Sequence, residues 1–141
     1  MLKRIVDSAF WNSWGVLIAR LIVAGQFLMA TTFKFTGIGR TAGYIAAAGF
    51  PLSLPLAWTA AVFELLLVIA FLTGVYFRQA AFLAMLYVLF LGFAFHGPSH
   101  WAGNQMEFGS FVDHFIYAAA LVYMVAHGTG NAWALRREQA G

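Results

Sequence analysis

Four long apolar runs constrain this chain more than any other feature of its sequence. They cover residues 14–33, 56–75, 80–96 and 111–125. A helix needs about 20 mostly apolar residues to cross a bilayer's hydrocarbon core, and it must satisfy its own backbone hydrogen bonds there. We therefore predict one transmembrane domain over residues 1–141, an all-α membrane protein in which a four-transmembrane-helix bundle carries a short interfacial helix in its first outer loop.

The composition agrees with a membrane solvent and excludes several functions. Hydrophobic residues make up 62% of the 141-residue chain and charged residues 9%, against about 25% charged residues in soluble domains. The formal net charge of +3 is small, and most basic residues flank the apolar runs, so nucleic acid is not an expected partner. The chain has no cysteine, which rules out disulfides, thiolate nucleophiles and cysteine-ligated metal clusters.

The basic residues predict an orientation. One side of the membrane would hold Lys3, Arg4, Arg78, Arg136 and Arg137, and the other side would hold Lys34 and Arg40. Because lysine and arginine favour the cytoplasmic side, we expect both termini in the cytoplasm. Residues 1–13 would form an interfacial segment there. The short helix would lie in the outer loop, within "RTAGYIAAAGFP".

Glu64 is the most informative polar residue, because it falls near the middle of the second run. The eleven Leu, Ile, Val or Phe residues of that run, at about 0.3–0.6 kcal/mol each, outweigh one central acid at about 3 kcal/mol. Insertion therefore tolerates Glu64 without explaining it. Two interpretations stand: a structural lock with Arg20, or proton exchange with a ligand. Arg20 and Lys34 lie near one face of the first helix, and we expect both as charge partners or interfacial anchors.

A second group of polar residues is expected at the outer ends of the third and fourth helices. His96 ends the third apolar run, and Asp113 and His114 begin the fourth. His114 and Tyr117 share a helix face, whereas Asp113 and His114 point about 100° apart. This combination suits proton handling, and it equally suits a hydrogen-bonded cap between two helices.

The sequence favours no intrinsic cofactor. No HExxH or tight His-x-His motif is present, so no metal site is predicted. Haem held by His96 and His114 is not favoured, because such sites usually lie deeper in a bundle. The many phenylalanines beside a few polar groups would suit a quinone, which needs apolar walls and donors to its carbonyls.

The order of these features resembles the DoxX family of small four-helix bacterial membrane proteins. The resemblance is carried by "ARLIVAGQFLMATTFKFTG", "AGYIAAAGFP", "VFELLLVIAFLTGVYFRQAA" and "FHGPSHW". Its markers are Arg20, Phe33-Lys34, the loop from Gly43-Tyr44 to Pro51, Glu64, Arg78 and His96. The fourth helix departs from the pattern, since Asp113-His114 stands where members often carry Lys-Asn.

The resemblance implies a protein of the bacterial cytoplasmic (inner) membrane that is linked to quinones or respiratory redox chemistry. One branch of the family is a subunit of a thiosulfate:quinone oxidoreductase. We therefore expect a quinone-associated membrane subunit that binds a quinone, or docks a redox partner, near the outer face. Whether such a subunit is itself catalytic stays open.

The candidate quinone-lining residues are Glu64, His96, Asp113 and His114, with Arg20 and Lys34 as charge partners. Membrane lipid and other membrane or redox subunits are the expected partners. The main alternative is a structural accessory subunit without a ligand of its own. A transporter is less favoured, because no pair of broken helices indicates a midplane site.

Overall fold

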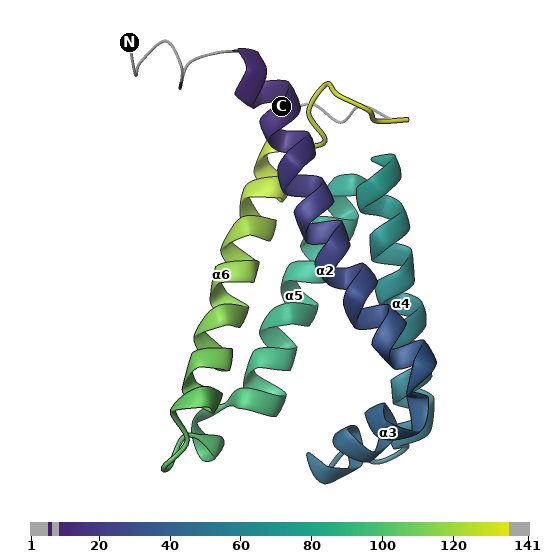
Figure 1. Cartoon of the computed structure of the whole chain (residues 1–141), viewed down its shortest axis with the longest axis vertical. Helices are drawn as coiled ribbons and strands as arrows, with labels where there is room; N and C mark the ends of the chain where they lie inside the picture. The colour runs from purple at the N-terminus through teal and green to yellow at the C-terminus, as the bar shows by residue number, and fades with distance from the viewer. Residues whose placement is uncertain (1–5, 7–8, 136–141) are drawn as a thin grey trace.

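The computed structural model describes residue 6 and residues 9–135. Within this range the fold consists of helices joined by turns and loops. Its elements are η1 (Trp11–Gly15), α2 (Val16–Thr36), α3 (Ile38–Ala47), α4 (Ser53–Thr73), α5 (Phe77–His96), η2 (Pro98–His100) and α6 (Gln105–His127). Four helical segments in this range are long and apolar enough to cross a membrane. The predicted four-helix bundle is confirmed, and α3 is the expected short helix in the first long loop (Figure 1).

The helix ends differ in detail from the predicted ranges. The last helix begins at Gln105 instead of residue 111, because Asn104 caps it: the Asn104 side chain accepts a hydrogen bond from the Glu107 backbone N–H at 3.4 Å. Such a cap satisfies one of the free N–H groups of a first helical turn. Most of the predicted interfacial segment, residues 1–5 and 7–8, lies outside the described residues, while η1 runs directly into α2.

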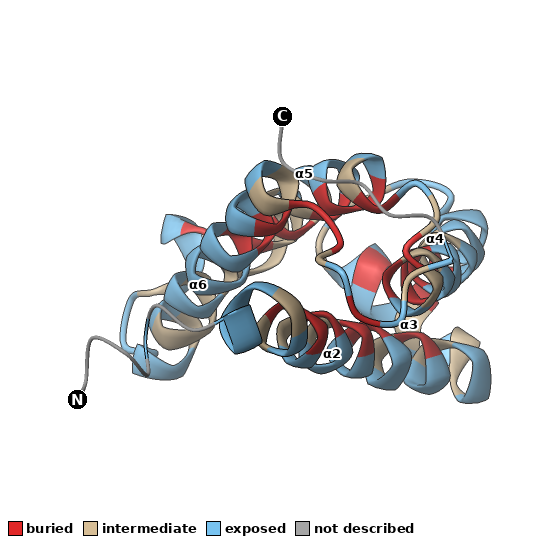
Figure 2. Cartoon of the chain, turned by 90° about the horizontal axis from the view of Figure 1, so that it is seen from above, coloured by how far each residue is buried: buried red, intermediate tan, exposed pale blue. Residues whose placement is uncertain are grey.

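The bundle consists of two helix pairs that diverge toward one end. Most contacts between helices join α2 to α4 and α5 to α6, whereas α4 and α5 touch much less. Helix α3 packs mainly on α4, at the wide end. Buried residues face inward between the helices, and the outward faces are exposed, as lipid contact requires (Figure 2). We call the end near Arg20 the closed end and the opposite end the α3 end.

Helices α2 and α4 pack antiparallel, and one hydrogen bond between them shows which residues lie side by side. Thr31, which is 2% exposed, donates a hydrogen bond from its Oγ1 to the Ala61 carbonyl at 2.7 Å. Residues before Thr31 on α2 therefore lie toward the C-terminus of α4, and residues after it lie toward the N-terminus of α4. This register decides which charged residue of α2 can reach Glu64.

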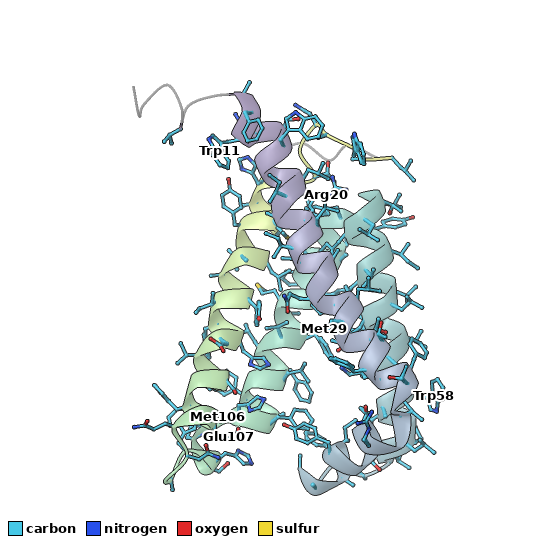
Figure 3. The ribbon with its side chains drawn as sticks, in the orientation of Figure 1. Trp11, Arg20, Met29, Trp58, Met106 and Glu107 are labelled. Atoms are coloured by element: carbon cyan, nitrogen blue, oxygen red, sulfur yellow. The ribbon has the colours of Figure 1, made fainter. Side chains whose placement is uncertain are left out.

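Arg20 fastens the closed end. Its side chain is fully buried, and all five N–H donors bond to backbone carbonyls. The acceptors are Phe71 and Leu72 at the end of α4, at 3.1 Å each, and Thr129, Ala132 and Trp133 after α6, at 3.2, 3.1 and 3.3 Å. The last carbonyls of a helix lack partners within the helix and carry partial negative charge, so they suit a guanidinium. Figure 3 shows Arg20 where these segments meet.

This position corrects the expectation that Arg20 acts as a partner of Glu64 or snorkels to headgroups. Arg20 lies eleven residues before Thr31 on α2, which is about 16 Å along the helix axis. Glu64 lies only one turn from Ala61. The arginine instead ties α2 to α4 and to the segment that follows α6.

We predict that replacing Arg20 with alanine destabilises the bundle strongly. The change leaves five carbonyls at the closed end without their donor, and breaking a buried charged network costs about 3–5 kcal/mol. Thermal unfolding of the detergent-solubilised variant should show a large fall in melting temperature. Arg40→Ala is the matched control, because Arg40 is exposed and should leave the melting temperature nearly unchanged. Equal melting temperatures for the two variants would contradict the role of Arg20.

Candidate functional site

Three side chains from three helices meet at Glu64. Glu64 lies near the middle of α4 and is 2% exposed. Its Oε1 accepts from the Lys34 Nζ of α2 at 2.9 Å and from the Tyr87 hydroxyl of α5 at 2.8 Å. We call Lys34, Glu64 and Tyr87 the polar triad. It joins the α2·α4 pair to α5, where the two halves of the bundle otherwise touch little.

The directions of the side chains explain why Lys34, and not Arg20, meets Glu64. Side chains of an α-helix lean toward its N-terminus. Because α2 and α4 are antiparallel, Lys34 leans toward the closed end and Glu64 leans toward the α3 end, so the two approach each other. The long lysine stem bridges the remaining axial distance.

Glu64 keeps one unused hydrogen-bonding atom. Its Oε2 is buried and has no hydrogen-bond partner among the described residues. Lys34 Nζ carries three N–H donors, of which the bond to Glu64 occupies one. The triad therefore retains both an acceptor and donors that its internal contacts do not use.

A cavity of about 1050 Å³ lies between the two helix pairs, in the α3 half of the bundle. Lys34 and Tyr87 form part of its wall, whereas Glu64 lies behind them. Most of the wall is apolar, with Met29, Phe33, Phe63, Phe90 and Leu91 among its members. The ionisable side chains in the wall are Lys34, Arg40, Tyr44, Tyr87, His96 and His114. A volume of this size matches the range of small-molecule sites.

Helix α3 covers this cavity and meets α5 through aromatic contacts. The Tyr44 ring stacks on Phe95 at 5.0 Å between centroids and an angle of 15°. Phe50 stacks on the same ring at 5.7 Å. Burial raises the pKa of the Tyr44 phenol, and the negative charge of Glu107 raises it further. The phenol therefore remains protonated and can donate a hydrogen bond.

Two histidines stand together at the α3 end of the cavity. The rings of His96 and His114 are 5.2 Å apart. His96 Nδ1 lies 2.6 Å from Glu107 Oε2, and His114 Nδ1 lies 2.6 Å from the Ser110 carbonyl oxygen. A carbonyl only accepts, so His114 Nδ1 must carry the proton and donate it. In neutral His114, Nε2 is therefore an acceptor.

A glycine allows the two helices to approach closely here. A Cβ added at Gly92 of α5 would lie 3.0 Å from His114 Cβ. The close packing of α5 on α6 depends on this small residue, and it sets the depth of His114 relative to His96.

The structure brings together some of the predicted site residues and separates others. Lys34 contacts Glu64, and His96 and His114 line one cavity. Asp113 is exposed on α6 and is not part of the cavity wall, so its place differs from the predicted lining. The reason is the 100° step between adjacent helical residues, which turns Asp113 away when His114 faces inward. Quinone binding itself stays a prediction.

Sequence reasoning missed Tyr87 and gave Arg40 no place in the site. Tyr87 carried a usable signal, because a tyrosine hydroxyl in the middle of an apolar run needs a partner inside the protein. Arg40 entered only the prediction of membrane orientation. Figure 3 shows Glu107 at the start of α6, at the α3 end. Among the residues that the structure describes, no three His, Cys, Asp or Glu residues gather in a way that could hold a metal ion.

Comparison with known proteins finds one family. The family model described as DoxX matches residues 15–97, which is more than half of the 141-residue chain. The matched region contains the whole polar triad and His96, while Glu107 and His114 follow it. No curated protein and no solved structure matches the chain.

We predict that Lys34 and Glu64 are strongly coupled in stability, which a double-mutant cycle measures. Lys34→Met leaves a buried carboxylate without its cation, and Glu64→Leu leaves a lysine without its anion. Each single change should cost about 3–5 kcal/mol, whereas the double variant should lie close to wild type, because a buried ion pair often contributes little against apolar replacements. Thermal unfolding of all four proteins measures the coupling. Additive losses in the double variant would show that the two side chains act independently.

Proposed function

This chain belongs to the DoxX family, and from that premise we propose that it is a quinone-binding membrane subunit of a redox system. The quinone ring would lie in the cavity between the helix pairs, beside the polar triad. The observation that carries the proposal is the position of Lys34 and Tyr87 in an otherwise apolar cavity wall, with the buried Glu64 directly behind them.

A quinone fits the chemistry of this wall. Its ring and tail require apolar surroundings, which the phenylalanines and Met29 provide. Its carbonyl oxygens accept hydrogen bonds, and the unused N–H groups of Lys34 and the Tyr44 hydroxyl are donors. Reduction of a quinone to a quinol consumes two electrons and two protons. In the proposed role a partner protein supplies the electrons.

The polar triad would supply one of these protons. Lys34 would give a proton to the reduced quinone and take up another from water, while Glu64, which accepts from both Lys34 and Tyr87 through one oxygen, stabilises the charged form of the lysine. A group that changes its protonation at a hydrogen-bonded position is suited to general acid–base work. His96 and His114 lie nearer the surface in the same cavity and would connect it to water through Glu107.

We also propose a location in the bacterial inner membrane with both termini in the cytoplasm. The described ends of the chain lie at the same end of the bundle (Figure 1). The larger number of lysines and arginines on that side supports a cytoplasmic position. Helix α3 and the α3 end of the cavity would then lie toward the outer face.

We predict that quinone binding weakens when Lys34 and Glu64, the two charged residues of the polar triad, are replaced together. Lys34→Met/Glu64→Leu should remain folded and should bind a short-chain ubiquinone or menaquinone analogue at least about tenfold more weakly, the loss expected for a charged donor. Tyr87→Phe should weaken binding less, because its hydroxyl hydrogen already serves Glu64. Titration of the purified protein in nanodiscs measures both affinities.

Tyr123→Phe is the matched control, because Tyr123 lies on α6 and is not part of the cavity wall. The proposal fails if the double variant binds the analogue as tightly as wild type. A stable partner protein that co-purifies with a chain unable to bind any quinone would instead support the structural-subunit alternative.

Single introduced cysteines test the orientation. The chain has no cysteine of its own, so only the introduced thiol reacts with a labelling reagent. Ser99→Cys in η2 should react with a membrane-impermeant maleimide added to intact spheroplasts. Gln79→Cys, near the α4–α5 turn, should react only after the membrane is permeabilised. The reverse pattern would place both termini outside.

A further inference from the structure

Arg40 is a cation of the cavity wall that forms no ion pair with any residue the structure describes. The ion pairs among the described residues are Lys34–Glu64 and His96–Glu107. Arg40 belongs to neither, although it lines the same cavity. Arg40 is exposed at the α3 end, so its guanidinium is accessible to an anion that comes from outside the described residues.

The Arg40 guanidinium packs against Gly37, in space that a side chain at this position would occupy. A Cβ added at Gly37, where α2 passes into α3, would lie 2.7 Å from Arg40 Nη2 and 2.9 Å from Nε. The guanidinium thus lies directly on the Gly37 backbone. This contact holds the planar donor group at the junction of the two helices, in the cavity wall.

The surroundings of Arg40 are those of an amphiphile's binding site. Beside its charge, the cavity offers a mostly apolar wall that includes Phe33, Leu56 and Phe63. Lys34 lies in the same wall and retains N–H donors that Glu64 does not occupy. A ligand that satisfies both features has an apolar chain and one anionic head.

We infer that the α3 side of this cavity binds an anionic amphiphile, whose carboxylate or phosphate monoester head pairs with Arg40 while its chain occupies the apolar part of the cavity. A guanidinium matches either head group, because its fork of N–H donors bonds two oxygens at once. This inference does not rest on quinone binding, which depends on the polar triad and not on Arg40.

The test uses purified protein in nanodiscs of zwitterionic lipid, with oleate, oleyl phosphate, oleyl alcohol and inorganic phosphate as probes. Native mass spectrometry should show one oleate or oleyl phosphate per chain, and the two probes distinguish the two head groups. Oleyl alcohol should bind at least about tenfold more weakly, since it lacks the charge. Inorganic phosphate should not compete, because it has no chain to bury.

Three variants locate the site. Arg40→Gln should weaken binding of the anionic probe at least about tenfold. Gly37→Ala should have a similar effect without unfolding the protein, because the new methyl group displaces only the flexible end of Arg40. Ala60→Phe adds a ring within the cavity wall and should exclude the chain. Arg78→Gln, which removes the same charge at the closed end, is the matched control.

Unchanged binding in Arg40→Gln, or equal binding of oleyl alcohol and oleate, would overturn the inference. Unchanged binding in Ala60→Phe would also overturn it, because Arg40 would then contact bulk lipid headgroups and not a ligand within the cavity. Quinone-analogue binding by Arg40→Gln, measured alongside, should equal that of wild type. This separates a failure of the anion site from a failure of the proposed function.

Discussion

The lack of water in a bilayer core favours partners within the chain for buried polar groups, and the arrangement of the helices follows from how Arg20 and Glu64 meet that demand. Arg20 and Glu64 are both buried in helices that are otherwise apolar. Each bonds to groups from other segments of the bundle, so each polar contact also joins separate parts of the fold. Arg20 fastens the closed end through five carbonyls, and Glu64 fastens the middle through Lys34 and Tyr87.

These two joints also explain why a cavity exists. Between the closed end and Glu64 the helices meet in one continuous core, in which alanines such as Ala24, Ala81 and Ala84 pack among larger side chains such as Phe71 and Phe77. Beyond Glu64 the α2·α4 and α5·α6 pairs separate, and aromatic contacts of Tyr44 in α3 and of Phe50 after it reach across to α5. A cavity that begins at a buried charged group is suited to a ligand that is mostly apolar but carries one reactive or polar end.

The polar residues of the cavity fall at two depths with different chemistry. The triad lies at the level of the middle of α4 and has both a donor and an acceptor that its internal contacts do not use. Arg40, His96 and His114 lie toward the α3 end, where a head group or water can reach them. Separation of this kind allows one cavity to hold a ligand deep within the bundle and to recognise charge at its entrance.

The sequence by itself determined the number of helices long enough to span a membrane, the short helix of the first long loop and the position of each ionisable residue along its helix. These depend on local hydropathy and on position along a helix, which need no knowledge of neighbours. Only the tertiary structure decided which residues meet. Lys34 and Arg20 share one helix and the same sign of charge, yet the antiparallel register set at Thr31–Ala61 brings Lys34 to Glu64 and leaves Arg20 with backbone carbonyls. The same holds for His114, which reaches the cavity beside His96, and for Asp113, which faces away, because the rotation of a helix about its axis is set by packing against its neighbours and not by its own apolar pattern.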